Sequence, residues 1–398
     1  MILNECKNHP LKSSSLVALA FIIRCILVFS FPQLSDDIYR FVWDGLLISE
    51  GIHPLSYTPE QLMEAFPDLG WSGLYENLNS QQYYTVYPPF SQLVFYLSAL
   101  PGVDQMAVSN IIIKLSLLAS EWGIYFLASR MLQMYGLARW YVFIYLLNPL
   151  VMVEIMGNAH FESFCVLSFL ASVYFLSQKR HLVSSASFAS SIAFKMFPLM
   201  FIPLLWKYWK EKKQFFRYVF ATALCSLLFF APFLLGLDLM HFFSSLDLYF
   251  QKFEFNASIY FVMRQAGFWL TGYNQIQIIG PFLAVMVILF IAYQSWRNAP
   301  TTPIELLHLS AQVFSFYILM ATTVHPWYLC FLVGITMFRP RLYIIVWSYC
   351  SVFSYVLYSE AMDGSYYFWV SLEYLIVASA FLWERKHLKS GHKKNLAE

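Results

Sequence analysis

Long apolar stretches recur along the whole chain and constrain its fold more than any other feature. The first, SLVALAFIIRCILVFSF at residues 15–31, is close to the roughly 17–25 residues that cross a ~30 Å hydrocarbon core. Only 12% of the 398 residues are charged, against about 25% in soluble domains. The sequence therefore predicts an all-α polytopic membrane protein, a single domain over residues 1–398 with about 12 transmembrane helices.

The sequence predicts neither a cleaved signal peptide nor a metal site built from cysteines. The run follows Lys7 and Lys12 as a secretory signal would, but it lacks a small-residue cleavage site, so we expect an uncleaved first helix. The six cysteines show no CxxC or metal-like spacing and are expected to fill the core.

Basic residues are clustered, and the clusters predict the topology. They lie at the N-terminus and at 130–139, 178–181, 206–217, 296–298, 338–341 and 384–394. By the positive-inside rule all of them face the cytoplasm, including a tail at about 385–398. The opposite face then carries a long first external loop, about 32–106, and a second large loop, about 237–275.

This topology makes two demands. YPPFSQLVFYLSAL (87–100) must lie on or dip into the outer face, and residues 181–206 must cross twice, turning at 195–198. The alternative is a full span at 87–104 with a single span at 182–206, which also gives about twelve helices. It would place the basic clusters 130–139 and 178–181 outside.

Paired carboxylates, Asp36 and Asp37 in SDDIYR, stand where the first apolar run ends. We expect Ser35 or Asp36 to cap a helix that stops at Gly51 and lays its apolar stripe along the membrane surface. One acid suffices for a cap. The second, beside a bilayer, suggests a general base or a divalent-cation ligand, and both interpretations remain open.

Lysines inside apolar runs have two interpretations. Lys195 in SIAFKMFPLM either snorkels to the interface or binds an anion such as a lipid phosphate, and we favour the second. Lys114 and Glu121, two helical turns apart, are predicted to form a structural pair.

Two polar turns complete the candidate site. In NPLVMVEIMGNAHFES, the residues Glu154, His160 and Glu162 form either a capping turn with a buried histidine or the wall of a polar pocket. HPWY contributes His325 and Trp327, for which an interfacial aromatic belt is a sufficient explanation. No GxGxxG, P-loop, HExxH or GxSxG motif is present, and we expect no nucleic acid partner.

These segments, in order, resemble the bacterial polytopic GT-C glycosyltransferases. SDDIYRFVWDGLLISEGIHPLSY, YPPFSQLVFYLSAL, GNAHFES, FKMFPLMFIPLLW, FNASIY and HPWY are similar to the polyprenyl-phosphomannose-dependent mannosyltransferases and the GPI mannosyltransferases, from about Leu34 to Tyr328. The resemblance implies a GT-C fold with membrane-parallel helices in the first external loop. It also implies transfer of a hexose, with mannose favoured, from a polyprenyl-phosphate donor to a glycolipid, glycan or protein acceptor.

The resemblance also implies roles for residues. Asp36 or Asp37 would be the catalytic base and Lys195 would hold the donor phosphate; the weaker pocket residues are Arg40, Glu154, His160, Glu162, His325 and Trp327. The chain has GIHPLSY where many relatives have Asn before the Pro, and HFES where Asp is expected, which leaves the role of Glu162 open. No cofactor is certain; Mg²⁺ or Mn²⁺ at Asp36 or Asp37 is left open.

We expect a bacterial inner-membrane protein whose site faces the extracytoplasmic side. The alternative function is a lipid or polysaccharide flippase or transporter. Such a protein should hold its key groups near the midplane, often in repeated halves, whereas the groups here are predicted to converge on one face.

Overall fold

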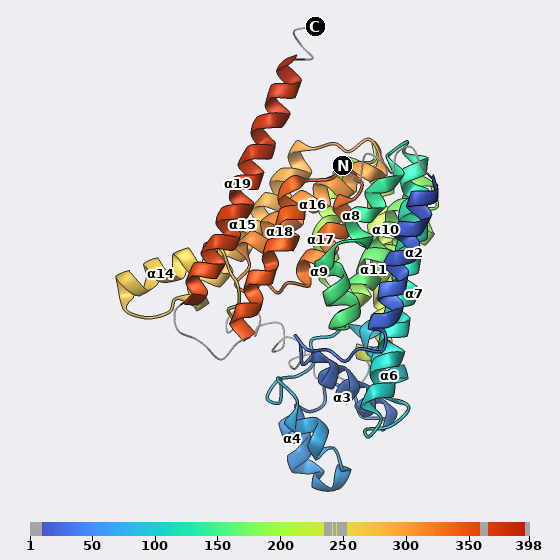
Figure 1. Ribbon diagram of the computed structural model, residues 1–398, viewed down its shortest axis with the longest axis vertical. Coiled ribbons are helices and arrows are strands. Elements are labelled where there is room, and N and C mark those ends of the chain that lie inside the picture. Colours follow the sequence, from blue (N-terminus) through green and yellow to red (C-terminus); the bar gives the residue numbers. More distant parts are fainter. Residues whose placement is uncertain (1–9, 235–240, 242–243, 245–252, 359–364, 395–398) are drawn as a thin grey trace.

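The computed structural model describes residues 10–234, 241, 244, 253–358 and 365–394, and within them helices dominate. No named strand occurs in these ranges; the β-pairing there is an isolated bridge between Phe255 and Thr323. Figure 1 shows a bundle of helices with a smaller lobe at one end, formed by α3, α4 and their neighbours.

The elements follow one another as helices of very different length. The first part of the chain forms α2 (Pro10–Leu27), α3 (Asp37–Ser49), α4 (Pro59–Ala65), η1 (Pro67–Leu69), α5 (Ser72–Glu76), α6 (Pro89–Ala99), α7 (Met106–Met134), η2 (Arg139–Val142), α8 (Phe143–Leu146), α9 (Pro149–Val151), the π-helix η3 (Met152–Gly157), α10 (Glu162–Ser177), α11 (His181–Phe194) and η4 (Phe197–Lys207). The rest forms α12 (Lys212–Leu234), α14 (Ile259–Thr271), α15 (Ile276–Arg297), α16 (Pro303–Met320), α17 (Tyr328–Thr336), α18 (Leu342–Cys350), η5 (Ser351–Tyr358) and α19 (Ser365–Lys394).

Five helices in the described ranges are long and apolar enough to cross a membrane: α7, α12, α15, α16 and α19. The segment from η2 to η3 makes a sixth if its two parts, bent by 52°, count as one span. Shorter apolar helices include α2, α10 and η4. The structure therefore supports an all-helical membrane protein, while the predicted total of about 12 spans is not confirmed.

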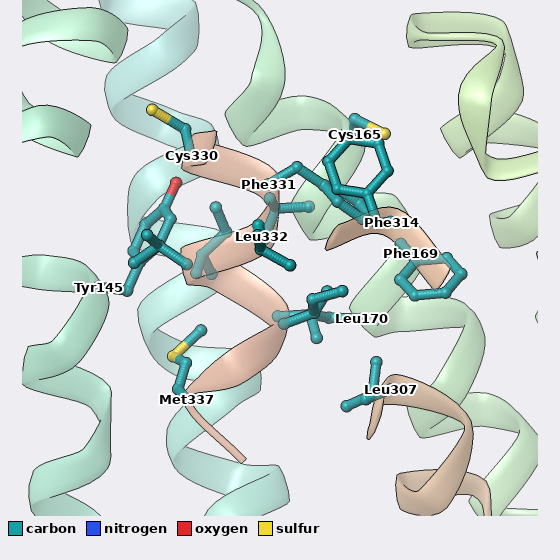
Figure 2. Close-up of a cluster of buried hydrophobic side chains, with 14 of the residues drawn as sticks. Tyr145, Cys165, Phe169, Leu170, Leu307, Phe314, Cys330, Phe331, Leu332 and Met337 are labelled. Atoms are coloured by element: carbon teal, nitrogen blue, oxygen red, sulfur yellow. The ribbon is translucent and has the colours of Figure 1, made fainter. Parts of the chain in front are cut away.

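The core lies around α17, whose residues from Leu329 to Thr336 are all buried. Figure 2 shows Phe331 of this helix near Phe169 of α10, and the two ring centroids lie 5.5 Å apart. A side chain at Gly334 would place its Cβ 2.8 Å from Val166 Cγ1, so glycine permits the close approach of α17 and α10. This tight packing fixes the two chain segments that end at the site described below.

Residues 181–207 form the predicted hairpin. α11 ends at Phe194 and η4 begins at Phe197, with Lys195 in extended backbone between them. His181, at the start of α11, lies against Trp209, just beyond η4, with ring centroids 5.9 Å apart. The single span of the alternative topology is therefore wrong, and α6, with 11 residues, is about half as long as a span requires.

The basic clusters at 130–139, 178–181, 206–217, 296–298 and 338–341 gather at the end of the bundle away from the lobe (Figure 1). Gln178 contacts Met134 at 3.3 Å, Lys207 contacts Trp296, and Arg341 pairs with Glu384 at 3.3 Å. These contacts join segments that lie far apart in sequence. The arrangement agrees with the charge-based topology, in which all these clusters share one face.

Helix α3 packs against protein instead of lying along a membrane surface. Its stripe residues Ile38 and Phe41 are fully buried, and a Cβ at Gly45 would lie 2.2 Å from the Phe95 carbonyl oxygen of α6. The surface prediction was wrong because α6 of the same lobe covers this face. The predicted stop was right: Gly51 follows the helix with φ +73°.

The predicted pair of Lys114 and Glu121 is also wrong. Glu121 instead pairs with Arg24 of α2 at 2.8 Å, and Lys114 Nζ donates to the carbonyl oxygens of Ser30 at 2.6 Å and Gly157 at 2.9 Å. α2 lies beside α7, so Glu121 pairs with a residue of the neighbouring helix instead of with Lys114 of its own helix.

Two predicted segments are only partly described. Most of the predicted second external loop before residue 253 lies outside the described residues, and its later part contains α14. The predicted tail at 385–398 continues helix α19 as far as Lys394, and the last four residues lie outside the described ranges.

Candidate functional site

A cavity of about 870 Å³ lies between the lobe and the helix ends of the bundle. Its lining combines two kinds of side chain. The polar wall includes Asp36, Asp37, Arg40, Asn79, Ser80, Thr85, Glu162 and Lys195, and the aromatic wall includes Phe197, Phe253, Phe314, Tyr317, Trp327, Tyr328 and Tyr355. His325 lines it as well. The cavity thus brings together residues that the sequence places more than 150 positions apart.

Asp36 and Asp37 both line the cavity but differ in their surroundings. Asp36 occupies the N-cap position of α3, is exposed, and makes no side-chain capping bond. The Asp37 amide donates to Ser35 Oγ at 3.3 Å, while its carboxylate accepts from Tyr87 Oη at 3.1 Å and Asn79 Nδ2 at 3.4 Å. Asp36 therefore holds the predicted N-cap position, but its carboxylate makes no capping bond and lies on the cavity together with that of Asp37.

His160 lies between two carboxylates, those of Glu154 and Asp37. It follows the π-helix η3 and Ala159, which has φ +64° and turns the chain sharply. His160 Nδ1 lies 2.8 Å from Glu154 Oε2, and Nε2 lies 3.6 Å from Asp37 Oδ2. Glu154 also accepts from Asn158 and Tyr355. The turn therefore joins α3 of the lobe to the bundle.

Charge and burial act in opposite directions on this pair. Burial alone would raise the pKa of Asp37, but His160 and the further partners His325 and Asn79 lower it to about 2. Burial alone would lower the pKa of His160, but Asp37 and Glu154 raise it to about 9. At neutral pH the site therefore holds an ionised Asp37 beside a positively charged His160.

Trp327 is the middle of a stack of rings. His160 stacks on it with centroids 3.9 Å apart, His325 stacks on it at 4.2 Å, and Phe255 stacks on His325 at 4.7 Å. Trp327 also lines the cavity, as does His325. Burial lowers the pKa of His325 to about 3, so this ring is neutral at physiological pH.

Lys195 faces the cavity from the break between α11 and η4. Its Nζ lies 2.9 Å from Glu162 Oε1 and 5.8 Å from the centroid of the Tyr87 ring. Glu162 is the first residue of α10 and is almost fully buried. The sequence singled out both residues, but it did not predict that they pair.

Arg40 lines the cavity while its guanidinium binds the protein. Nε lies 2.8 Å from Asp44 Oδ1, and Nη1 donates to the carbonyl oxygens of Tyr83 at 2.9 Å and Ser80 at 3.2 Å. Asp44 also accepts from Gln92 at 2.8 Å. Arg40 therefore anchors the segment that carries Asn79 and Tyr87.

Three residues of the site were missed by the sequence reasoning. Asn79 and Tyr87 hold Asp37, and Tyr355 donates to Glu154. Tyr87 opens the YPPF segment, where its position offered a signal. Asn79 and Tyr355 stand in ordinary polar and aromatic contexts, so nothing in the sequence marked them.

The cavity side chains offer few ligands for a divalent cation. Within the described ranges no three His, Cys, Asp or Glu side chains converge as metal ligands. Asp37 already accepts hydrogen bonds and faces the charge of His160. A divalent cation, which prefers about six oxygen ligands, would need most of them from substrate and water, and the predicted Mg²⁺ or Mn²⁺ stays a prediction.

Residues 6–211, more than half of the 398-residue chain, match the family model described as alpha-(1->6)-mannopyranosyltransferase, N-terminal domain. The chain belongs to this mannopyranosyltransferase family. No curated protein matches it. The matched residues include both aspartates, His160 and Lys195, whereas His325 and Trp327 lie beyond them. Membership confirms the resemblance to mannosyltransferases and supports a glycosyltransferase with mannosyl transfer activity.

Proposed function

We propose that this protein transfers mannose from a polyprenyl-phosphate donor to an acceptor hydroxyl at the extracytoplasmic end of the bundle. The observation that carries the proposal is the single cavity lined by Asp36, Asp37 and Lys195, within the residues that match the mannopyranosyltransferase family. A mannosyl donor linked to phosphate needs a cation for the phosphate and a base for the acceptor, and the polar wall offers both.

Mannosyl transfer forms one bond at C1 of the sugar and breaks another. The acceptor hydroxyl oxygen forms a bond to C1 of the mannosyl group, and the C1–O bond to the phosphate breaks. The electron pair of that bond leaves with the polyprenyl phosphate, whose charge Lys195 stabilises. The hydroxyl proton goes to one of the paired aspartates. Because Lys195 is already paired with Glu162, the donor phosphate would have to share or displace that contact.

The aromatic wall supports a lipid-linked donor. Phe314 and Tyr317 belong to α16, a candidate membrane span, and Phe197 begins η4. Apolar rings beside the phosphate-binding lysine suit the first isoprene units of a polyprenyl chain. The basic clusters at the opposite end favour an extracytoplasmic cavity in a bacterial inner membrane.

The experiment is a transfer assay with the purified full-length chain in proteoliposomes. The donors are polyprenyl phosphates carrying mannose, glucose or galactose, each with a glycolipid, a glycan or a peptide acceptor, with and without EDTA. We expect a covalent product from the mannose donor. Movement of the labelled lipid between leaflets with no covalent product would instead favour a flippase, and loss of transfer in EDTA would establish a divalent cation.

A further inference from the structure

His160 stands behind the cavity wall and is held from both sides. Its ring is 2% exposed, and it is absent from the residues that line the cavity. Nδ1 faces Glu154 of η3 at 2.8 Å, and Nε2 faces Asp37 of α3 at 3.6 Å. Glu154 is itself fixed by donors from Asn158 and Tyr355. Any influence of His160 on a substrate must therefore pass through a neighbour.

The plane of the ring is fixed by stacking. His160 lies on Trp327, Trp327 on His325, and His325 on Phe255, with centroid distances between 3.9 and 4.7 Å. Phe255 is tied to the chain before α17 by backbone bonds, including Val324 N to Phe255 O at 2.7 Å. A ring held this way presents Nε2 to one place, the Asp37 carboxylate.

The charged groups that line the cavity indicate what the contact between His160 and Asp37 would do. Three carboxylates line it, those of Asp36, Asp37 and Glu162, against the cations of Arg40 and Lys195. A donor phosphate adds further negative charge. This repulsion would both protonate and displace a mobile carboxylate. A positive ring behind Asp37 opposes that effect. Besides Asp37, the titratable groups that interact with the ring are Glu154 and His325.

We propose that His160 is a positioning residue for mannosyl transfer, holding the Asp37 carboxylate where it receives the proton of the acceptor hydroxyl. This inference rests on the proposed function and deepens it. In the step described above, the proton goes to Asp37, while the new bond forms at C1 and the phosphate leaves with the electron pair. Asp37 is assigned the base because its carboxylate has an orienting partner, whereas the Asp36 carboxylate makes no hydrogen bond or ion pair within the described residues.

Two substitutions at His160 separate positioning from support of the fold. His160→Phe keeps a flat ring against Trp327 but removes both nitrogens, whereas His160→Gln loses the ring and keeps an amide donor toward Asp37. We expect His160→Phe to lower kcat about 100-fold with the donor KM changed less than about 3-fold, and His160→Gln to lower it about 10-fold. The reverse order, with His160→Phe the milder change, would mean that the ring only supports the fold.

Glu154→Gln provides the second, isosteric test. It leaves the cavity shape unchanged and removes one of the two charges that hold His160, so we expect a loss of about 10-fold in kcat with the donor KM unchanged. A kcat equal to that of the wild type would overturn the proposal even if His160→Phe does not fold. His181→Gln, an exposed histidine at the opposite end of α11, is the matched control and should behave as wild type.

The two proposals fail in different ways. A wild-type protein that transfers no mannose refutes the proposed function. A wild type that transfers mannose, with Asp37→Asn inactive and full kcat in both His160→Phe and Glu154→Gln, refutes the positioning role alone.

Discussion

Two groups of buried charges in this protein look alike in sequence and differ in structure. In the first, Arg24 pairs with Glu121 at 2.8 Å, Tyr145 Oη donates to Glu121 at 2.6 Å, and Lys114 binds carbonyl oxygens. In the second, Lys195 pairs with Glu162 and His160 lies between Glu154 and Asp37. We call them the interhelical charges and the cavity charges.

The difference between the groups is access. Arg24, Lys114 and Glu121 are fully buried, and none of them lines the cavity. Arg24 and Glu121 join α2 to α7, and Lys114 joins α7 to Gly157 of η3. Asp37 and Lys195, by contrast, keep part of their surface on the cavity. An intramembrane charge is therefore a weak indicator of function until its exposure to a cavity is known.

The largest effect should follow from removing the proposed base. Asp37→Asn keeps the size of the side chain and removes the proton acceptor, so we expect transfer per folded molecule to fall about 10²–10⁴-fold. The measurement is initial rate with the mannose donor at saturation. Asp36→Asn is the matched control and should lose at most about 3-fold; equal losses would refute the assignment to Asp37.

Glu121→Gln should show the opposite pattern. It leaves Arg24 buried without its counter-charge, and breaking a buried ion pair costs about 3–5 kcal/mol. We expect a clear fall in Tm in detergent, while molecules that remain folded keep wild-type kcat. A large loss of kcat at unchanged Tm would erase the distinction between the two groups of charges.

Lys195→Met should act on the donor. The charge-assisted contact with a phosphate contributes about 1.5–3 kcal/mol, so we expect the donor KM to rise about 10–100-fold, together with a fall in kcat. The check is a donor titration at a fixed acceptor concentration. Lys114→Met, a lysine of the interhelical charges, is the control; a rise in its donor KM equal to that of Lys195→Met would contradict the comparison.

The smallest effect concerns pH and stability. The pKa of His160 is raised from 6.5 to about 9, so its contribution to stability is fully present below about pH 6.5 and is lost as the pH rises through 9. We expect the free energy of unfolding of the wild type to fall by about 1–3 kcal/mol between pH 7 and pH 10, so that Tm falls over this range and falls less in His160→Gln. If Tm falls equally with pH in the two proteins, the raised pKa of His160 does not contribute to stability, and this prediction is contradicted.

The sequence predicted where charges enter the apolar chain better than it predicted their partners. Asp36, Asp37, Lys195 and the turn at His160 were found because a charged or polar group in an apolar run is rare and costly. The break at Lys195 followed from basic residues on both sides of the segment, which require an even number of crossings. These are local properties, and they can be recognised without a fold.

The partners depend on packing between distant segments. Glu121 was assigned to Lys114 because both lie on α7, yet α2 brings Arg24 to it. Tyr355 reaches Glu154 from 201 positions away. The number of spans was equally difficult, because α10 and α11 have only 16 and 14 residues and cross the bundle shielded by their neighbours.

The central claim is that the cavity lined by Asp37 and Lys195 binds and uses the lipid-phosphate donor. The most direct measurement is a structure of the full-length protein with polyprenyl phosphate bound. The account predicts the phosphate inside this cavity, with an oxygen about 3 Å from Lys195 Nζ and the first isoprene units along Phe197 and Phe314. A phosphate bound elsewhere, with the cavity empty and the Lys195–Glu162 pair unchanged, would contradict it.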